Sequence, residues 1–177
     1  MTQRRRLAIL ILTVAVVATV VAVGRIQSAA AAPAGMVVVE WQGAFDGKAT
    51  LPAQLAWCPI TRLGTLEAIS TDTGILFSLR ERDSLTVGHH PIVTAAEDST
   101  AANPTRSAAV AAMRWVLDSA TIGGFRGVSG ALDIATLDST ASGRFDVQMV
   151  RAGAADTIQV RGEFKGVPMV VSAIGCT

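Results

Sequence analysis

This chain is poor in the residues from which catalytic, haem and metal sites are usually built. Its 177 residues include two cysteines, two histidines and no tyrosine. Two cysteines cannot hold an iron–sulfur cluster without ligands from another chain, and the haem-attachment motif C-x-x-C-H is absent. No phosphate-binding loop or dinucleotide-binding fingerprint occurs either. We therefore predict a non-enzymatic protein without catalytic, cofactor-binding or metal-binding residues.

Basic charge is scarce beyond the N-terminus. The first 25 residues hold four of the 15 basic residues and none of the 14 acidic ones, so the remainder has a net charge of −3. Proteins that bind nucleic acid carry a basic surplus on the face that reads it. We therefore expect no nucleic-acid partner.

The one long hydrophobic run lies near the N-terminus. Arg4, Arg5 and Arg6 precede 17 uncharged residues that begin with Leu7 and end with Val23. As a helix this run covers about 26 Å, close to the ~30 Å core of a bilayer. A basic segment before an apolar run also fits a secretory signal, which small residues at 28–32 would allow to be cleaved. We expect an uncleaved transmembrane anchor over residues 7–26, with a signal peptide as the alternative.

The positive-inside rule gives this anchor an orientation. Residues 1–6 then form a cytoplasmic basic tip, residues 27–35 a linker of small residues, and residues 36–177 a periplasmic domain. The predicted location is the inner membrane of a bacterium, with the N-terminus inside.

Cys58 and Cys176 both lie in the part of the chain that this anchor would export. In an oxidising compartment such a pair most simply forms one disulfide. A loop of this length would stabilise the fold by roughly 4–5 kcal/mol in the chain-entropy model. A reactive thiol or a metal ligand would need a low-pKa environment or further ligands, and the sequence around neither cysteine offers them.

Hydrophobic residues in the exported part alternate with a period of two. In residues 157–164, Ile158, Val160 and Phe164 fall on one face and polar residues on the other, and residues 143–150 repeat the pattern. Such alternation is typical of antiparallel strands with one solvent-exposed face. Turn residues at 138–140 and 153–156 make residues 128–165 a predicted three-stranded meander.

Further strands are predicted along the rest of the exported part, and together they define the fold class. They lie at residues 36–42, 48–58, 64–70, 75–80 and 84–87. Residues 96–106 form the longest predicted loop. The alanines of residues 107–117 favour a helix, but Trp115 and Val116 in a β context favour a strand, which we prefer. The expected fold is all-β, an antiparallel β-sandwich or small barrel.

His89 and His90 are adjacent and precede Pro91. Neighbours on an extended chain point to opposite faces, so the two side chains would not share a metal ion. We interpret the pair as a polar turn before an edge strand. A hydrolase that uses one of them is a third hypothesis, although the sequence lacks a G-x-S-x-G motif.

Acidic residues in or near predicted loops allow one calcium site, although solvated side chains explain them more simply. They are Asp72, Glu81, Asp83 and Asp98. Among the tryptophans, Trp57 next to Cys58 is predicted to lie in the core. Trp41 follows the anchor closely, so it lies either in the core or at an interface with the membrane or a partner.

The stretch SGALDIATLDSTASGRFDVQMVRAGAADTIQVRGEFKGVPM, residues 129–169, resembles exported β domains and lipoproteins of Gram-negative bacteria. Their closing strands have similar S-G-x-F turns and D-T-I-x-V-x-G-x-F alternation. The resemblance covers about a quarter of the chain and implies a β fold without catalytic residues. The sequence departs from lipoproteins because no cysteine follows the apolar run.

The architecture, one N-terminal span and a small exported domain, resembles accessory subunits of inner-membrane complexes such as photosynthetic reaction-centre–antenna assemblies. This resemblance implies a non-enzymatic, membrane-anchored subunit whose partner is an integral membrane protein complex. The alternative is a periplasmic binding module for a small apolar ligand or a glycan. That alternative predicts an interior cavity lined by phenylalanines, namely Phe45, Phe77, Phe145 or Phe164.

Overall fold

The computed structural model describes residues 32–100, 107–118, 121–172 and 176. These residues fall within one compact unit, residues 31–177. Within the described residues, no helix is both long enough and apolar enough to cross a membrane. The predicted basic tip and anchor, with Arg4, Arg5, Arg6, Leu7 and Val23, lie outside the described residues, as do residues 27–31 of the predicted linker.

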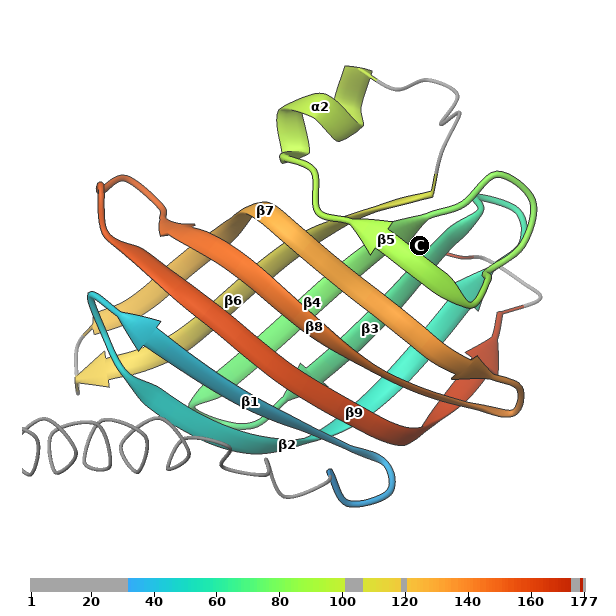
Figure 1. Cartoon of the computed structure of the whole chain (residues 1–177), viewed down its shortest axis with the longest axis horizontal. Coiled ribbons are helices and arrows are strands. Elements are labelled where there is room, and N and C mark those ends of the chain that lie inside the picture. Colours follow the sequence, from blue (N-terminus) through green and yellow to red (C-terminus); the bar gives the residue numbers. More distant parts are fainter. Residues whose placement is uncertain (1–31, 101–106, 119–120, 173–175, 177) are drawn as a thin grey trace, which may run out of the picture. The chain divides into compact units, whose positions relative to one another are not determined.

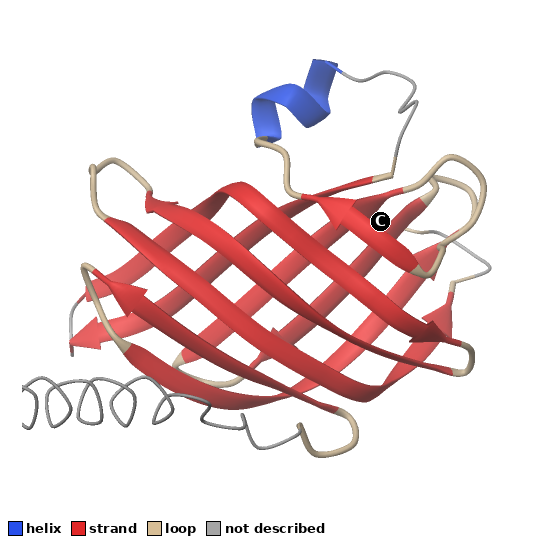
Figure 2. Ribbon diagram, viewed as in Figure 1, coloured by secondary structure: helices blue, strands red, loops and turns tan. Residues whose placement is uncertain are grey.

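Eight antiparallel strands close into a barrel, and one short strand and one short helix lie outside this ring of strands (Figures 1 and 2). The elements in chain order are β1 (Met36–Gly43), β2 (Gly47–Cys58), β3 (Leu63–Ile69), β4 (Thr73–Arg80), β5 (Gly88–Pro91), α2 (Ala95–Thr100), β6 (Ala108–Asp118), β7 (Thr121–Leu137), β8 (Thr140–Arg151) and β9 (Thr157–Val171).

The order around the barrel is β1-β2-β3-β4-β6-β7-β8-β9, and β9 pairs again with β1 to close it. Strand β5 stands outside this ring and pairs with β7. The end of β9 also runs parallel to the end of β2, where residues 169–171 pair with residues 55–57. Of the two predicted architectures, the structure is therefore the barrel.

Most predicted strands are confirmed. Residues 107–117 form a strand, β6, and the three-stranded meander is β7, β8 and β9. The strand predicted at residues 84–87 is wrong, because that segment is a loop from which Leu85 alone is buried. The loop predicted at residues 96–106 begins instead inside the short helix α2.

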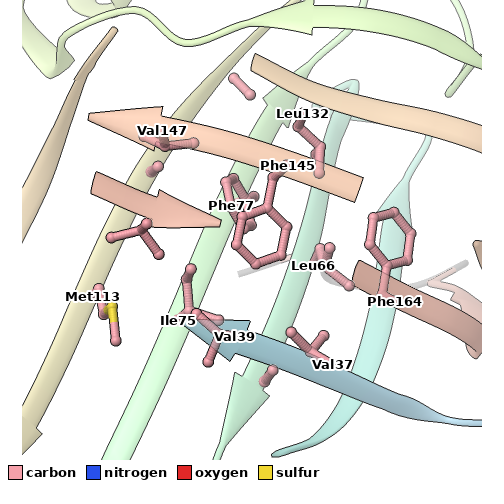
Figure 3. Close-up of a cluster of buried hydrophobic side chains, with 14 of the residues drawn as sticks. Val37, Val39, Leu66, Ile75, Phe77, Met113, Leu132, Phe145, Val147 and Phe164 are labelled. Atoms are coloured by element: carbon pink, nitrogen blue, oxygen red, sulfur yellow. The ribbon is translucent and has the colours of Figure 1, made fainter. Parts of the chain in front are cut away.

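The interior of the barrel is filled by hydrophobic side chains from all eight strands (Figure 3). Inward-facing positions alternate with outward-facing ones, as the period-two pattern predicts. The rings of Phe77 and Phe145 meet in this core with centroids 4.9 Å apart. Eight strands enclose a space that side chains can fill, and in this barrel the buried side chains form one hydrophobic cluster.

Two phenylalanine–glycine pairs join β8 to β9. Phe145 lies opposite Gly162, and Gly143 lies opposite Phe164. A Cβ atom on Gly162 would come within 2.3 Å of Cζ of Phe145, and one on Gly143 within 2.6 Å of Cζ of Phe164. Each glycine therefore leaves the space that the opposite ring occupies, which gives a physical reason for the repeated G-x-F pattern.

The predicted disulfide is confirmed. Cys58 ends β2 and is bonded to Cys176, which follows β9 and is 118 residues away in sequence. The side chain of Trp57 is buried beside it, 7% exposed, which confirms its predicted place in the core. The covalent bond holds the C-terminal end of the chain to the same end of the barrel as the β2–β3 turn.

Candidate functional site

Strand β5 carries both histidines of the chain. His89 lies opposite Asp133 of β7, and its Nδ1 is 2.8 Å from the Asp133 Oδ1. The side chain of His90 points to the other face and is only 1% exposed. The predicted opposite orientation is therefore confirmed. The predicted polar turn is wrong, because both histidines lie within the short strand itself.

His90 belongs to a buried polar network that connects three parts of the barrel. Its Nδ1 lies 3.1 Å from Oε1 of Glu81, which follows β4 and has a side chain 2% exposed. Ser107, just before β6, donates a hydrogen bond from Oγ to Oε2 of the same carboxylate. The His90 Nε2 is 3.1 Å from the carbonyl oxygen of Thr86. The two ring nitrogens therefore face two oxygens, one of the Glu81 carboxyl group and one of the Thr86 backbone.

The connectivity of this network differs from that of a serine hydrolase. In a hydrolase the serine hydroxyl gives its proton to the histidine, which an acid orients from the far side. Here Ser107 contacts the carboxylate, and the free side of the His90 ring faces a backbone carbonyl. Among the described residues, neither histidine contacts a serine hydroxyl, so the hydrolase hypothesis has no nucleophile–base pair to use there.

A second, exposed polar group lies on the outer face of β5, β7 and β8. Asp133 contacts His89, and its Oδ2 is 3.4 Å from Nε of Arg144. The hydrogen bond from His89, reinforced by the one from Arg144, holds the pKa of Asp133 below its ordinary value of 3.8. These contacts attach the outer side of β5 to the barrel wall.

The acidic residues that suggested a calcium site are not brought together. Asp98 is engaged by Arg80, with Nε 2.8 Å from Oδ1 and Nη2 2.9 Å from Oδ2. Glu81 belongs to the buried network, Asp72 lies in the β3–β4 turn, and Asp83 lies beside Arg82. In the part of the chain that is described, no group of three metal-ligating side chains is placed to hold an ion.

An aromatic cluster fills the barrel at the β1–β2 turn. The rings of Trp115 and Phe125 stack with centroids 4.4 Å apart, and Trp41 lies 5.2 Å from Trp115. Trp41 is only 6% exposed, and its indole covers Gly47, where a Cβ atom would lie 2.2 Å away. The alternative that placed Trp41 at a membrane or partner interface is therefore wrong, because β1 turns this side chain into the core.

The four phenylalanines predicted to line a ligand cavity serve as packing instead. Phe77, Phe145 and Phe164 are at most 3% exposed and belong to the continuous core (Figure 3). Phe45 is half-buried at the edge of the aromatic cluster, with the Arg151 guanidinium 5.7 Å from its ring centroid. These rings pack against core neighbours, as Phe77 and Phe145 do with centroids 4.9 Å apart.

The outer surface of the barrel has two contrasting walls. The polar wall consists of outward-facing residues of β1, β8 and β9, namely Glu40, Arg144, Asp146, Arg161, Glu163 and Lys165. The apolar wall consists of outward-facing residues of β4, β6 and β7, namely Leu76, Val110, Ala112, Val116 and Ile122, with Arg114 and Arg126 as its charged members. Val116 is 42% exposed and Ile122 is 64% exposed.

A groove of about 380 Å³ crosses the apolar wall and has a predominantly apolar lining. Its sides are two rows of outward-facing residues that are paired across neighbouring strands. One row is Ile69, Gly74, Arg114 and Gly124, and the other is Glu67, Leu76, Ala112 and Arg126. Between them lies the inward-facing row Ile75, Met113 and Phe125. The groove therefore lies on the outer face, perpendicular to the strands.

Small residues produce this hollow. Gly74, Ala112 and Gly124 alternate with larger side chains in the two rows, so the surface falls where they occur. A Cβ atom on Gly124 would meet nothing within 4 Å. This groove could not be predicted from the sequence, because the groove depends on the register between neighbouring strands. In the sequence, the segment GGFRG, residues 123–127, indicates it only in part, because glycine and arginine occur there at alternate positions.

Comparison of the chain with protein-family models, with curated proteins and with solved structures gives no match. A function for this chain is therefore inferred from the chemistry and geometry of the described residues.

Proposed function

We propose that this chain is a non-enzymatic, membrane-anchored periplasmic subunit that stabilises a larger inner-membrane complex by docking the apolar wall of its barrel on it. The contrast between the two walls carries the proposal. The polar wall carries six charged residues, whereas the apolar wall carries two, Arg114 and Arg126, and exposes the cross-strand pair Val116 and Ile122. Contiguous exposed apolar surface in a small domain is typical of an interaction site.

The N-terminal sequence supports a role at the membrane. Arg4, Arg5 and Arg6 and the apolar run from Leu7 to Val23 have the composition of an anchor with the N-terminus inside. An anchor would confine the barrel to the membrane surface and raise its effective concentration beside an integral membrane partner. The disulfide fits an oxidising compartment such as the periplasm. Photosynthetic reaction-centre–antenna assemblies are one class of complex that such a subunit would serve.

The docking proposal is tested by changing one exposed apolar site at a time. Wild-type full chain, solubilised from membranes with a mild detergent, is expected to migrate in a native gel with a large complex. Val116→Asn with Ile122→Asn should release it, because two polar amides would replace the apolar contact. Val170→Asn with Val171→Asn is the matched control, since these valines are 47% and 53% exposed at the end of β9. A partner-free wild type, or a wall variant that still co-migrates, would contradict the proposal.

The anchor is tested separately by intact-mass spectrometry of protein purified from the membrane fraction. We expect the mass of the complete chain, about 18.3 kDa, with one disulfide formed. A species that has lost about the first 30 residues would show that the apolar run is a cleaved signal, and the membrane-anchored form of the proposal would be abandoned.

The groove favours a second function, the binding of a small apolar ligand. The candidate position for that ligand is the outer wall, since the interior phenylalanines are packed.

A further inference from the structure

We propose that the groove across the apolar wall binds a free single-chain carboxylate, that is, one acyl chain with an anionic end. This inference goes beyond docking on a membrane complex. The groove occupies the two rows next to Val116 and Ile122 and shares Leu76 and Ala112 with the apolar wall, so a bound ligand and a docked partner would lie against the same wall.

The width of the groove selects a single extended chain. The Cα atoms of its two rows lie two positions apart along each strand, or about 6.6 Å at ~3.3 Å per residue, which is an upper limit on the width of the groove. An α-helix with its side chains is roughly 10–12 Å across and does not fit between such rows. Across the strands the rows run from β3 to β7, three interstrand spacings of ~4.8 Å, which gives about 14 Å. A narrow, apolar and elongated hollow of this kind suits an acyl chain.

The charge of the groove selects an anionic end. Arg114 and Arg126 both line it and are exposed, and in the described part of the chain neither has a carboxylate within ion-pair distance. By contrast, four other arginines on or next to the strands are engaged by aspartates, namely Arg80, Arg144, Arg151 and Arg161. Two guanidinium groups without partners beside an apolar floor are suited to hold a carboxylate.

The positions of the charges also orient the ligand. Arg114 pairs with Gly124, and Arg126 lies two residues further along β7, so the two arginines are diagonal neighbours about 7–8 Å apart at Cβ. Their long side chains can both reach one carboxylate. Glu67 lies at the β3 end of the groove and would repel an anion there. The anionic end therefore lies over β6 and β7, and the apolar tail runs over Leu76 toward Ile69.

Gly124 offers a way to block the groove without disturbing the core. A side chain added there enters open space, and the residue has no left-handed backbone conformation that only glycine favours. Gly124→Leu would place an isobutyl group in the groove beside both arginines. Its thermal unfolding should match that of the wild type, so that loss of binding reports a filled groove and not a damaged fold.

The experiment uses the full chain in phosphatidylcholine nanodiscs and a dodecanoate that carries a photoreactive diazirine in its chain. After irradiation, mass spectrometry maps the labelled residues. We expect labels on β4, β6 and β7 at the groove, with competition by unmodified dodecanoate. Labelling should fall about tenfold in Arg114→Gln with Arg126→Gln, because a lost charge-assisted contact weakens binding by about that factor. It should fall by about as much in Gly124→Leu, because the new side chain fills the groove. Even labelling around the barrel, or undiminished labelling in Gly124→Leu, would overturn the proposal.

Two further labelling experiments identify the chemical class of the ligand and its source. Dodecanol with the same diazirine should label the groove about tenfold less, since it lacks the anion; equal labelling would overturn the assignment of a carboxylate. Replacing part of the phosphatidylcholine by phosphatidylglycerol should leave labelling unchanged. Loss of labelling in those anionic nanodiscs would show that bilayer lipid is the occupant instead of a free carboxylate.

The two proposals fail independently. Val116→Asn with Ile122→Asn should release the chain from its complex while groove labelling persists, and Gly124→Leu should lower labelling about tenfold while the folded barrel persists.

Discussion

Two glycines determine how β8 and β9 pack together. Gly143 and Gly162 each lie opposite a phenylalanine ring, so that a reciprocal pair of Gly–Phe contacts spans the two strands. The sequence showed the pattern as S-G-x-F and V-x-G-x-F, but it could not show that the two motifs face each other. Register joins them, and register depends on the turn at residues 152–156 together with the alternation of the strands.

Gly162→Ala is expected to destabilise the barrel by about 2–3 kcal/mol, because overpacking forces neighbours to move. The new methyl group would lie 2.3 Å from the Phe145 ring and 2.5 Å from the carbonyl oxygen of Val38, which is backbone and cannot turn aside. Urea unfolding followed by tryptophan fluorescence measures the change.

Gly124→Ala is the matched control, since its methyl group meets nothing within 4 Å. This variant should be neutral or up to ~1 kcal/mol more stable, because glycine weakens the interior of a strand. Equal destabilisation of the two variants would contradict the packing argument.

Asp133 is expected to make the folded protein less stable as the pH falls. Its pKa is lowered in the folded protein, so its contribution is complete above the ordinary value of 3.8 and is lost as the pH falls toward the lowered folded value. Because the group is partly exposed, the effect should be at most ~1 kcal/mol. Unfolding free energies of wild type and Asp133→Asn, compared at pH 7 and pH 3, should differ at pH 7 and converge at pH 3. A difference that grows at pH 3 would reverse the assigned sign.

Most strands of the barrel were predicted from the sequence, but the helix α2 and the strand β5 were not. Alternation found β1, β2, β3, β4, β8 and β9, because one face of each is buried. The helix α2 was missed although the sequence T-A-A-E, residues 94–97, is a capping box. In the structure Thr94 donates from its backbone N–H to Glu97 at 2.7 Å, a contact that lowers the pKa of Glu97. Strand β5 was missed because its position depends on His90 and Glu81, which are distant from β7 in sequence.

The buried pair of His90 and Glu81 should behave differently when one or both partners are removed. His90→Leu or Glu81→Met alone is expected to cost about 1–3 kcal/mol, because each leaves a buried polar atom facing an apolar side chain. The double variant should be much more stable than the sum of the single effects predicts, since two apolar side chains of similar size replace the pair. Urea unfolding of the four proteins gives the coupling energy. Additive effects would show that the two side chains do not interact.

The closure of the sheet into a barrel could not be predicted from the sequence. Both a sandwich and a barrel bury alternate residues, and only the pairing of β9 with β1 separates them. The groove was missed for the same reason, because its two rows bring together residues from β3, β4, β6 and β7. The disulfide was predictable, since the sequence offers each of the two cysteines one partner.

Removing the disulfide should lower stability by about 4–5 kcal/mol in the chain-entropy model, because the bond closes most of the domain into one loop. Calorimetry of Cys58→Ala with Cys176→Ala against the oxidised wild type measures the loss. The reduced wild type is the control and should resemble the double variant. A double variant as stable as the oxidised protein would contradict the predicted contribution of the 118-residue separation.

The central claim is that this barrel acts through its apolar wall on an integral membrane partner. Photocrosslinking in intact membranes tests it most directly, with a photoreactive amino acid placed at Val116 in one full-length variant and at Val170 in another. The two valines are similarly exposed, at 42% and 47%. We predict a crosslink to one integral membrane protein from Val116 and none from Val170. Equal crosslinking from both positions, or crosslinking from Val170 alone, would contradict the account.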